Sequence, residues 1–396
     1  MSWLTLIGIG ADGLDGLSQR ARRALAAAEV LVGGARHLAM LPEDGRPRLF
    51  WRSPLADSLP EILALRPRPV ALLATGDPLW YGVGRLLLQH LSLAEVAIVP
   101  HVSAFQEACS RLGWALEEAV PLTAHGRPVA ALRRHFQPGR RLLVLTADGS
   151  GPAAIAQCVA ADGYGESGIT VLEEMGGARE RRTEATAATL DGSFADLNLV
   201  AIELAATARP RPSVPGLPDD AYEHDGQLTK TEVRAVTLAA LAPCDGALLW
   251  DVGAGAGSVA IEWLRAGRAM RAIAIERDSA RAARIAVNAE RLGVPELVVH
   301  TGAAPAALAG LPAPHAIFVG GAVAAPGLLD LCWTRLESGG RLVVNAVSVA
   351  GEAALLAFHA ARGGRLLRLQ LARAENVGTQ LVWRPAMPVT QLMVRK

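Results

Sequence analysis

Short apolar runs alternate with longer amphipathic stretches along the first half of the chain. Runs of β-branched and leucine residues predict buried strands, and apolar residues spaced three or four apart predict helices. Strands are expected over 4–9, 70–74, 96–99, 142–146, 169–172 and 197–204. Helices are expected over 18–28, 84–91, 104–112 and 153–161. This alternation indicates an α/β architecture, and a weak break near 120–126 indicates two small lobes.

A proline-rich stretch then interrupts the pattern. Four closely spaced prolines lie within residues 206–227, and a polar run follows them: Pro210, Pro212, Pro215, Pro218 and residues 219–225. Proline stops helices and cannot pair in a central strand, so we interpret 206–227 as a linker. The predicted domains are therefore 1–205, with lobes of about 1–120 and 121–205, and 228–396.

The alternation after the linker is more regular. Helices are expected over 232–241, 258–266, 280–292, 304–308, 328–336 and 352–361. Strands are expected over 247–252, 271–276, 297–301, 316–319 and 341–347, with a β-rich tail ending in 388–394. Regular strand–helix alternation predicts one Rossmann-like, doubly wound domain.

Charge and composition narrow the functional classes. The 396 residues carry a formal net charge of +1, which argues against a protein that binds nucleic acid by neutralising phosphates. Lys230 and Lys396 are the only lysines, so arginine supplies almost all positive charge. A GC-rich genome explains this, and recognition of several carboxylates is also compatible with it. Four scattered cysteines predict no zinc site and no disulfides, and no apolar run reaches membrane-spanning length, so we expect a cytoplasmic protein.

A glycine-rich loop follows the first strand after the linker. It comprises Asp251, Gly253, Ala254, Gly255, Ala256 and Gly257. Glycine allows the backbone to approach a ligand closely and to adopt positive φ. The G-x-G-x-G spacing differs from the G-x-G-x-x-G of dinucleotide sites, and an acid before the glycines would repel a pyrophosphate but accept hydrogen bonds from an ammonium group. The loop therefore predicts a site for S-adenosyl-L-methionine.

Neighbouring strand ends supply further candidates for this site. Glu276 ends the next strand, where an acid can accept hydrogen bonds from both ribose hydroxyls. Thr229 and Glu232 match a capping box, with Thr229 as N-cap, and this threonine could also contact the donor. At the third strand, Ala303 stands where many such enzymes carry an acid, so backbone groups of Ala303 and Ala304 would recognise adenine there.

Three strand ends in the first half carry a second set of candidates. Gly8 and Gly10 follow the first strand, Gly76, Asp77 and Tyr81 lie in a Gly-Asp-Pro turn and its continuation, and Ser103 can cap the next helix. Each could be an ordinary tight turn, but three at successive strand ends favour a shared binding edge. His125 at the lobe junction is a candidate general acid or base, although a lone loop histidine is more often structural.

These motifs resemble two known families. Residues 8–13, 75–82, 100–106 and 123–127 resemble the C5-methylase branch of the tetrapyrrole methylases. Residues 228–230, 250–257, 318–321, 345–347 and 388–391 resemble the decarboxylating methylases of the cobalamin pathway. Joined in this order, they are similar to the fused methylases of vitamin B12 synthesis. The resemblance implies a tetrapyrrole substrate that the first domain methylates at C5 and the second methylates at C15 and decarboxylates at the ring C acetate. It also implies a homo-oligomer, since the family of the second domain tends to form tetramers.

Three departures from that pattern concern the second domain. His315 and Ala303 stand where relatives tend to carry an acid, and Ala322 where they tend to carry glycine. Two alternatives therefore stay open: a methyltransferase acting on RNA or a small metabolite, and a sensor that binds the donor without turnover. The order of the methylations, the residue that promotes decarboxylation and the transfer of the intermediate between domains do not follow from the sequence.

Overall fold

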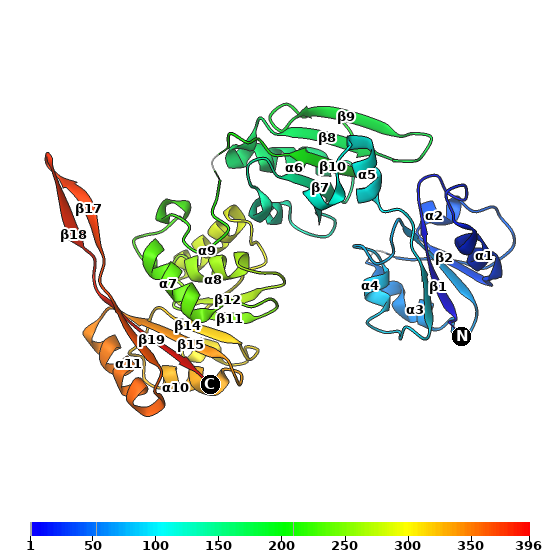
Figure 1. Ribbon diagram of the computed structural model, residues 1–396. Helices are drawn as coiled ribbons and strands as arrows, with labels where there is room; N and C mark the ends of the chain where they lie inside the picture. The colour runs from blue at the N-terminus through cyan, green and yellow to red at the C-terminus, as the bar shows by residue number, and fades with distance from the viewer. Residues whose placement is uncertain (1, 53, 209) are drawn as a thin grey trace. The chain divides into compact units, whose positions relative to one another are not determined.

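The computed structural model describes residues 2–52, 54–208 and 210–396. The chain forms two compact units (Figure 1). The first comprises Met1–Val129 and Gln137–Arg209, and the second Ala130–Phe136 and Pro210–Lys396. Each is described separately. No helix within the described ranges has the length and hydropathy needed to cross a membrane.

The first lobe of unit 1 is a five-stranded, wholly parallel sheet with strand order β3-β2-β4-β1-β5. Its strands are β1 (Leu4–Ile9), β2 (Val30–Gly33), β3 (Arg48–Phe50), β4 (Val70–Thr75) and β5 (Val96–Val99). Its helices are α1 (Gln19–Ala27), α2 (Ala35–Ala39), α3 (Leu59–Leu63) and α4 (Gly84–Leu87). Because parallel strands all end at one edge, the loops after β1, β2, β4 and β5 meet there.

The second lobe of unit 1 is a mixed sheet with order β6-β7-β10-β8-β9, in which only β6 and β7 are parallel. Its strands are β6 (Ala119–Thr123), β7 (Arg141–Leu145), β8 (Gly168–Glu173), β9 (Arg181–Thr186) and β10 (Asn198–Glu203). The α-helices α5 (Ala104–Leu112) and α6 (Gly151–Val159) accompany this sheet. Phe105 and Ala108 of α5 share a buried cluster with Leu143 and Leu199, so α5 packs on this sheet.

Unit 2 is built on a seven-stranded sheet with order β13-β12-β11-β14-β15-β19-β16. Its strands are β11 (Leu248–Val252), β12 (Arg271–Glu276), β13 (Val298–Thr301), β14 (Ala316–Val319), β15 (Arg341–Ala346), β16 (Arg365–Leu369) and β19 (Val389–Arg395). Its helices are α7 (Thr231–Leu241), α8 (Ser258–Arg265), α9 (Ser279–Arg291), α10 (Leu328–Arg335) and α11 (Val349–Arg362). β11 to β15 are parallel, and β19 is antiparallel to both of its neighbours.

Both faces of this sheet are buried, which explains the continuous apolar runs of its strands. One face carries Leu249, Phe318 and Val343 against residues of α7, α8 and α9. The opposite face carries Trp250 and Leu342, among others, against residues of α10 and α11. The helices on both faces leave the carboxyl ends of the parallel strands as the edge where a ligand can approach.

Two pieces of unit 2 lie outside this sandwich. Strands β17 (Ala372–Val377) and β18 (Gln380–Pro385) form a two-stranded hairpin whose residues are all exposed, seen as the red arm in Figure 1. The short segment Ala130–Phe136 also belongs to unit 2. Its Arg134 donates to the Gly293 carbonyl at 2.8 Å and pairs with Glu296 at 2.6 Å, beyond the end of α9.

The structure corrects three expected elements. The helix expected over 84–91 is the single turn of α4, and the helix expected over 304–308 is a 3-10 turn, Ala306–Leu308. Helix α7 has Lys230 as its N-cap and no side-chain capping bond, so the expected capping box is wrong. The Thr231 hydroxyl instead donates to the Leu217 carbonyl at 3.1 Å, because the preceding linker folds back against this turn.

Candidate functional sites

The glycine loop of unit 2 turns tightly between β11 and α8. Gly253, Gly255 and Gly257 have φ of 74°, 61° and 77°, in the region that favours glycine. A Cβ on Gly253 would lie 2.7 Å from the Gly321 Cα, and one on Gly255 2.9 Å from the Gln227 carbonyl oxygen. Neither position has room for a side chain. Ala254 and Ala256 occupy the alternate positions, and the Ala254 carbonyl accepts a hydrogen bond from the Gly257 amide at 2.8 Å.

Asp251 lies beneath this loop and is 1% exposed. Its Oδ2 accepts a hydrogen bond from the Ala260 amide in the first turn of α8, whereas its buried Oδ1 has no hydrogen-bond partner among the described residues. Burial, together with the nearby Glu276 carboxylate and against the lowering effect of the Ala260 hydrogen bond, raises the pKa of Asp251 to about 7. A buried acceptor oxygen without a partner is costly, and a cationic ligand would lower that cost.

Glu276 connects the second strand to the loop. It is 5% exposed and accepts hydrogen bonds from the Gly255 amide at 2.9 Å and the Asp278 amide at 3.1 Å. Its carboxylate is therefore held in one orientation at the end of β12, one strand away from Asp251. The two acids predicted from the strand ends are thus adjacent, as the sheet order requires.

Ala303 and Ala304 follow β13 at the same edge. The Gly302 amide donates to the Glu276 carbonyl at 2.9 Å, which places this turn beside the end of β12. The Ala303 carbonyl accepts from the Ala307 amide at 3.0 Å, and Ala304 packs against the apolar cluster on the α10 and α11 side of the sheet. Neither side chain offers a polar contact, so recognition by backbone groups remains a prediction.

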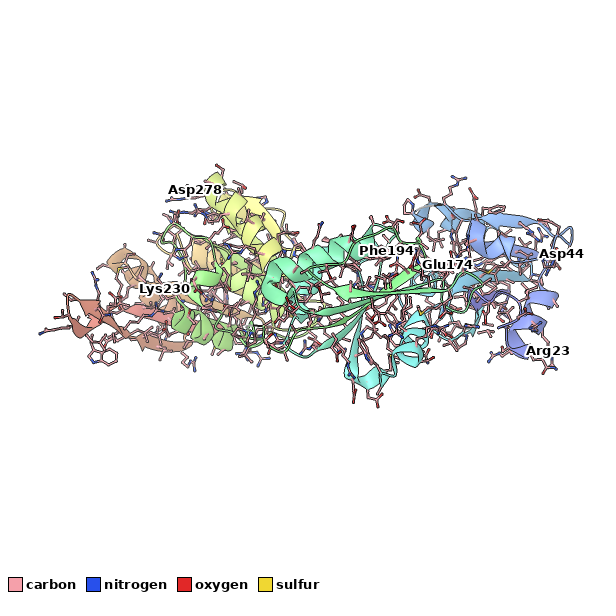
Figure 2. All side chains as sticks on the ribbon, turned by 90° about the horizontal axis from the view of Figure 1, so that it is seen from above. Arg23, Asp44, Glu174, Phe194, Lys230 and Asp278 are labelled. Atoms are coloured by element: carbon pink, nitrogen blue, oxygen red, sulfur yellow. The ribbon has the colours of Figure 1, made fainter. Side chains whose placement is uncertain are left out.

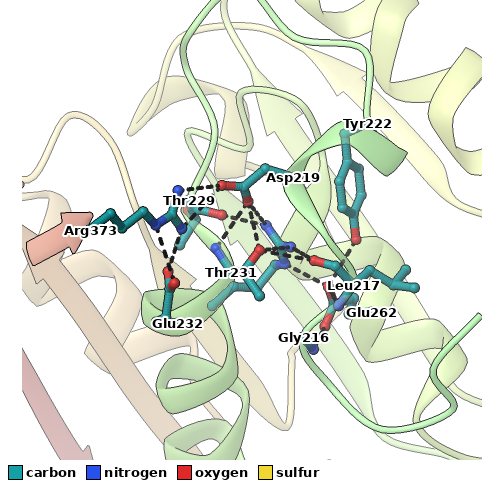
Figure 3. Close-up of polar contacts among 10 residues, drawn as sticks. Gly216, Leu217, Asp219, Tyr222, Thr229, Thr231, Glu232, Glu262 and Arg373 are labelled. Carbon is teal, nitrogen blue, oxygen red and sulfur yellow. Dashed lines mark hydrogen bonds and ion pairs between the residues drawn. The ribbon is translucent and has the colours of Figure 1, made fainter. Parts of the chain in front are cut away.

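Thr229 leads into α7 rather than capping it. Its carbonyl accepts a hydrogen bond from Arg234 at 2.5 Å. The Arg234 side chain is fully buried and pairs with Glu262 of α8 at 2.6 Å, and the same carboxylate accepts from the Tyr222 hydroxyl at 3.0 Å. Figure 3 shows these contacts, together with the ion pair between Arg373 at the base of the hairpin and Glu232. The linker is therefore attached to the helices beside the glycine loop.

The departures from the family pattern lie at different edges of the unit 2 sheet. His315 precedes β14, and its Nδ1 accepts from the amide of Leu248 at the start of β11, so it lies at the edge opposite the glycine loop. Ala322 follows Gly320 and Gly321 and has φ of 56°, a conformation that strains a residue with a Cβ.

Unit 1 contains a cavity of about 760 Å³ lined by both of its lobes. The strand-end loops predicted to meet do so. A Cβ on Gly8 would lie 2.0 Å from the Gly76 carbonyl oxygen, and one on Gly76 would lie 3.3 Å from the Ser103 Cα. Ser103 caps α5 and forms a capping box with Gln106. Gly10, Gly76, Asp77, Tyr81, Ser103 and His125 all line the cavity.

The Gly-Asp-Pro turn is stiff. The Asp77 Oδ1 accepts a hydrogen bond from the Leu79 amide at 2.8 Å, which fixes the carboxylate at the end of β4. The Tyr81 hydroxyl donates to the Pro121 carbonyl of the other lobe at 3.2 Å, and the Arg127 guanidinium lies 5.5 Å from its ring centre. The turn thus presents one acid to the cavity and joins the two lobes.

His125 is exposed and lines the cavity on the side of the second lobe. Its backbone amide donates to the Thr123 hydroxyl at 3.1 Å, which anchors the loop. The ring has no hydrogen-bond partner among the described residues, so a catalytic role for His125 remains a prediction.

Sequence reasoning missed part of the cavity wall. Arg36 and His37 follow β2, a strand that the apolar pattern did not predict, and Trp51 follows β3. Gly34, His37 and Trp51 line the cavity. The signal that could have identified them is the run Val30–Gly33, a short apolar strand followed by a glycine and two adjacent basic residues.

Comparisons with known proteins agree with this architecture. Residues 3–191 match the family model of the tetrapyrrole (corrin/porphyrin) methylases, and residues 220–396 match that of the precorrin methyltransferase domain. Two α/β units of these kinds define a two-domain methyltransferase. The chain is 50% identical over 394 residues to precorrin-6Y C(5,15)-methyltransferase [decarboxylating] of Sinorhizobium sp, covering 98% of this chain and 95% of the relative. The chain belongs to the family of decarboxylating precorrin-6Y C(5,15)-methyltransferases.

Two further similarities concern single halves. The chain is 33% identical over 180 residues to a cobalt-precorrin-7 C(5)-methyltransferase of Salmonella typhimurium, covering 45% of this chain and 88% of that protein. It is 45% identical to the crystal structure of the C-terminal domain of precorrin-6Y C5,15-methyltransferase from Rhodobacter capsulatus, with a TM-score of 0.45 and coverage of 47% of this chain and 100% of that one.

Proposed function

We propose that this chain uses S-adenosyl-L-methionine to methylate a precorrin at C5 and C15 and to decarboxylate its ring C acetate during cobalamin biosynthesis. The observation that carries the proposal is the presence of two ligand-binding edges in one chain. One is the loop over Asp251 in unit 2, and the other is the Gly8–Gly76–Ser103 edge of the unit 1 cavity. Similarity over nearly the whole chain to relatives named for two methylations supports it.

We assign C15 methylation and decarboxylation to unit 2 and C5 methylation to unit 1. A relative named for C5 methylation alone spans 45% of this chain, which is compatible with one reaction in each half. The proposed domains are 1–205 and 228–396, joined by the linker 206–227. The compact units and the two matched ranges divide the chain in the same region.

The residues of unit 2 fit the proposed donor. Asp251 has a buried, unpartnered oxygen suited to the ammonium group, Glu276 is an oriented acid suited to ribose hydroxyls, and the glycines between them carry no side chain that would keep a ligand away from the backbone. In unit 1 the corresponding edge is formed by Gly8, Gly76 and Ser103, with Asp77 fixed beside it.

The donor supplies an electrophilic methyl group on a sulfonium, which a ring carbon of the macrocycle displaces. The protein therefore mainly has to align the two reactants and exclude water. Stiff turns such as Asp77–Leu79 and the buried acids beneath the glycine loop provide fixed positions for this alignment. Loss of carbon dioxide leaves an electron pair on the acetate methylene carbon, which then takes up a proton to become a methyl group.

We further propose a homo-oligomer assembled through the β17–β18 hairpin of unit 2, a tetramer being the state that the family resemblance implies. Every residue of both strands is exposed, and Trp383, Leu381 and Val377 are 75%, 68% and 59% exposed. An isolated two-stranded hairpin is at best marginally stable in water, so these apolar side chains require a covering surface. The four free cysteines are compatible with the reducing cytoplasm.

The decisive experiment is incubation of the purified full chain with labelled donor and precorrin-6B, followed by mass spectrometry of the tetrapyrrole. We expect two labelled methyl groups to be added and one carbon dioxide to be lost. Tight donor binding without label transfer would overturn the proposal and favour a sensor. Transfer of label to RNA in a parallel incubation would instead favour the other alternative.

A further inference from the structure

One corner of the unit 1 cavity contains a compact set of nitrogen groups that the donor site does not use. The Arg36 Nη2 donates to the Thr75 hydroxyl at 2.8 Å, and the His37 Nε2 lies 2.9 Å from the same oxygen. His37 is 7% exposed and Thr75 lines the cavity. Arg36 forms no ion pair with a described carboxylate; burial lowers its pKa, and the Glu174 carboxylate at longer range partly opposes that shift.

The contacts of His37 determine which ring nitrogen carries the proton. The Arg36 Nη2 lies 3.3 Å from Nε2, and a guanidinium can only donate. Nε2 is therefore the acceptor in the neutral ring, and the proton is on Nδ1. Burial and the adjacent Arg36 lower the pKa of His37 to about 4, so the ring stays neutral at physiological pH. Nδ1 is buried and has no hydrogen-bond partner in the described part of the chain.

A second N–H group flanks the same space. The Trp51 ring packs edge-on against His37, with ring centres 5.7 Å apart. A Cβ built on Gly34 would lie 3.1 Å from the Trp51 Nε1 and 3.4 Å from the His37 Nδ1. Gly34 has φ of −68°, which any residue can adopt, so the backbone conformation does not require glycine here. The absence of a side chain instead leaves space between two N–H donors in the cavity wall.

We propose that this carboxylate-binding corner, formed by Gly34, Arg36, His37 and Trp51, binds a carboxylate substituent of the tetrapyrrole during C5 methylation. The two neutral N–H donors, His37 Nδ1 and Trp51 Nε1, match an oxyanion because each can contact one oxygen, and the Arg36 guanidinium on the Nε2 side of the same ring adds positive charge at longer range. The inference rests on the proposed function of unit 1 and adds a specificity determinant to it.

The opposite wall of the cavity is compatible with this assignment. Glu174, labelled in Figure 2, also lines the cavity, but both of its oxygens accept hydrogen bonds from Arg179 at 2.8 and 2.9 Å. Its negative charge is therefore paired directly with Arg179, and its interaction with Arg36 is a weaker one at longer range. An anionic substituent entering the corner would meet unpaired donors there rather than a free acid.

Three variants of the full chain test the corner. Trp51→Phe removes one donor but keeps the ring against His37, Arg36→Gln removes the charge, and Gly34→Ala fills the space without backbone strain. A hydrogen bond to a charged group contributes enough for its loss to raise KM about tenfold or more. We expect each variant to raise the KM for the tetrapyrrole in C5 methylation by at least that factor. The kcat, the affinity for S-adenosylhomocysteine and C15 methylation should stay unchanged.

Arg20→Gln serves as the matched control, because Arg20 is an exposed arginine of α1 outside the cavity lining. Wild-type KM values in Trp51→Phe and Arg36→Gln would overturn the carboxylate-binding corner while leaving the proposed function intact. If the affinity for S-adenosylhomocysteine fell by the same factor by which the KM for the tetrapyrrole rose, the corner would belong to the donor site instead. Absence of C5 methylation in the wild-type chain would overturn the proposed function itself, and the inference with it.

Discussion

Arg234 of α7 and Glu262 of α8 form an ion pair in which the side chains are 0% and 2% exposed, with Nε and Oε1 2.6 Å apart. The Glu262 carboxylate also accepts hydrogen bonds from the Gly216 and Leu217 amides of the linker, and Arg234 donates to the Leu217 carbonyl. One buried pair therefore joins two helices of unit 2 to the chain segment that precedes them.

Removing one partner of this pair should destabilise unit 2 strongly. Arg234→Met leaves the Glu262 carboxylate buried without its cation, and such losses typically cost about 3–5 kcal/mol. Urea unfolding of the full chain measures the change. Arg384→Gln is the control, because it breaks an exposed pair with Glu375 and should cost less than about 1 kcal/mol. Similar midpoints for the two variants would contradict a structural role for the buried pair.

Two matched glycine variants should separate the two donor sites. Gly255→Val places a side chain against the Gln227 carbonyl oxygen, and Gly76→Val places one against the backbone of 102–103. Both positions also have positive φ, so each loop must shift. We expect calorimetric titration with S-adenosylhomocysteine to show two sites in the wild-type chain and one in each variant.

The methylated products should distinguish the two variants in the same way. Gly255→Val should lose C15 methylation, and Gly76→Val should lose C5 methylation of a substrate already methylated at C15. Equal loss of both methylations in either variant would be inconsistent with two independent pockets.

Asp251 should make the stability of the ligand-free chain depend on pH. Its pKa is raised from 3.8 to about 7 in the folded chain, so the folded state binds the proton more tightly than the unfolded state. The contribution of Asp251 to the free energy of unfolding should therefore fall by roughly 4 kcal/mol as the pH rises from about 4 through 7, whereas His37, with a folded pKa lowered to about 4, contributes in the opposite direction. Asp251→Asn should remove this slope in urea titrations at several pH values, and an unchanged slope would refute the assignment.

The same ionisation predicts how donor binding varies with pH. The charged carboxylate accepts an ammonium better than the protonated acid, so affinity for S-adenosylhomocysteine in unit 2 should rise between pH 6 and pH 8. Calorimetry on Gly76→Val, which retains only the unit 2 site, isolates this effect. Asp251→Asn in that background should bind with little change over the same range.

Ala322 should be a position where glycine stabilises the chain. Its φ of 56° costs a residue with a Cβ about 1–2 kcal/mol, and the greater freedom of glycine in the unfolded chain offsets part of that gain. We expect Ala322→Gly to raise the free energy of unfolding by a few tenths to about 1 kcal/mol. Ala266→Gly, at φ of −76°, is the control and should lower it.

The proposed hairpin interface predicts a change of assembly state. Replacing Leu381 and Trp383 with serine removes two of the largest exposed apolar side chains of β18. Sedimentation velocity should show a smaller species than the wild-type chain, with unchanged far-ultraviolet circular dichroism. An identical sedimentation coefficient would exclude this hairpin as the interface.

Sequence patterns predicted those parts of the fold that local residues determine. β1, β5, β12, β14 and α5 have the predicted bounds, because turn residues or a capping serine bracket each apolar run. The meeting of Gly8 with Gly76, and of Gly255 with Glu276, followed from the rule that parallel strands end at one edge.

What the sequence could not indicate depends on contacts between distant segments. The capping box of Thr229 and Glu232 failed because α7 begins one residue later, with Lys230 as its N-cap, and the Glu232 carboxylate pairs with Arg373 of the distant hairpin. The corner at His37 and Trp51 was missed because β2 and β3 are only four and three residues long, too short for a clear period.

The order of strands in unit 2 has a consequence for the synthesis of the chain. β16 pairs only with β19, and β19 lies between β15 and β16 in the sheet. β16 is nevertheless synthesised first, because its first residue, Arg365, precedes Val389, the first residue of β19, by 24 positions. While a ribosome adds residues at about 5–20 per second, β16 waits without its partner strand, and the β17–β18 hairpin is also made before that strand. During that interval of a few seconds, this segment is the part of the nascent domain most exposed to aggregation or to capture by a chaperone.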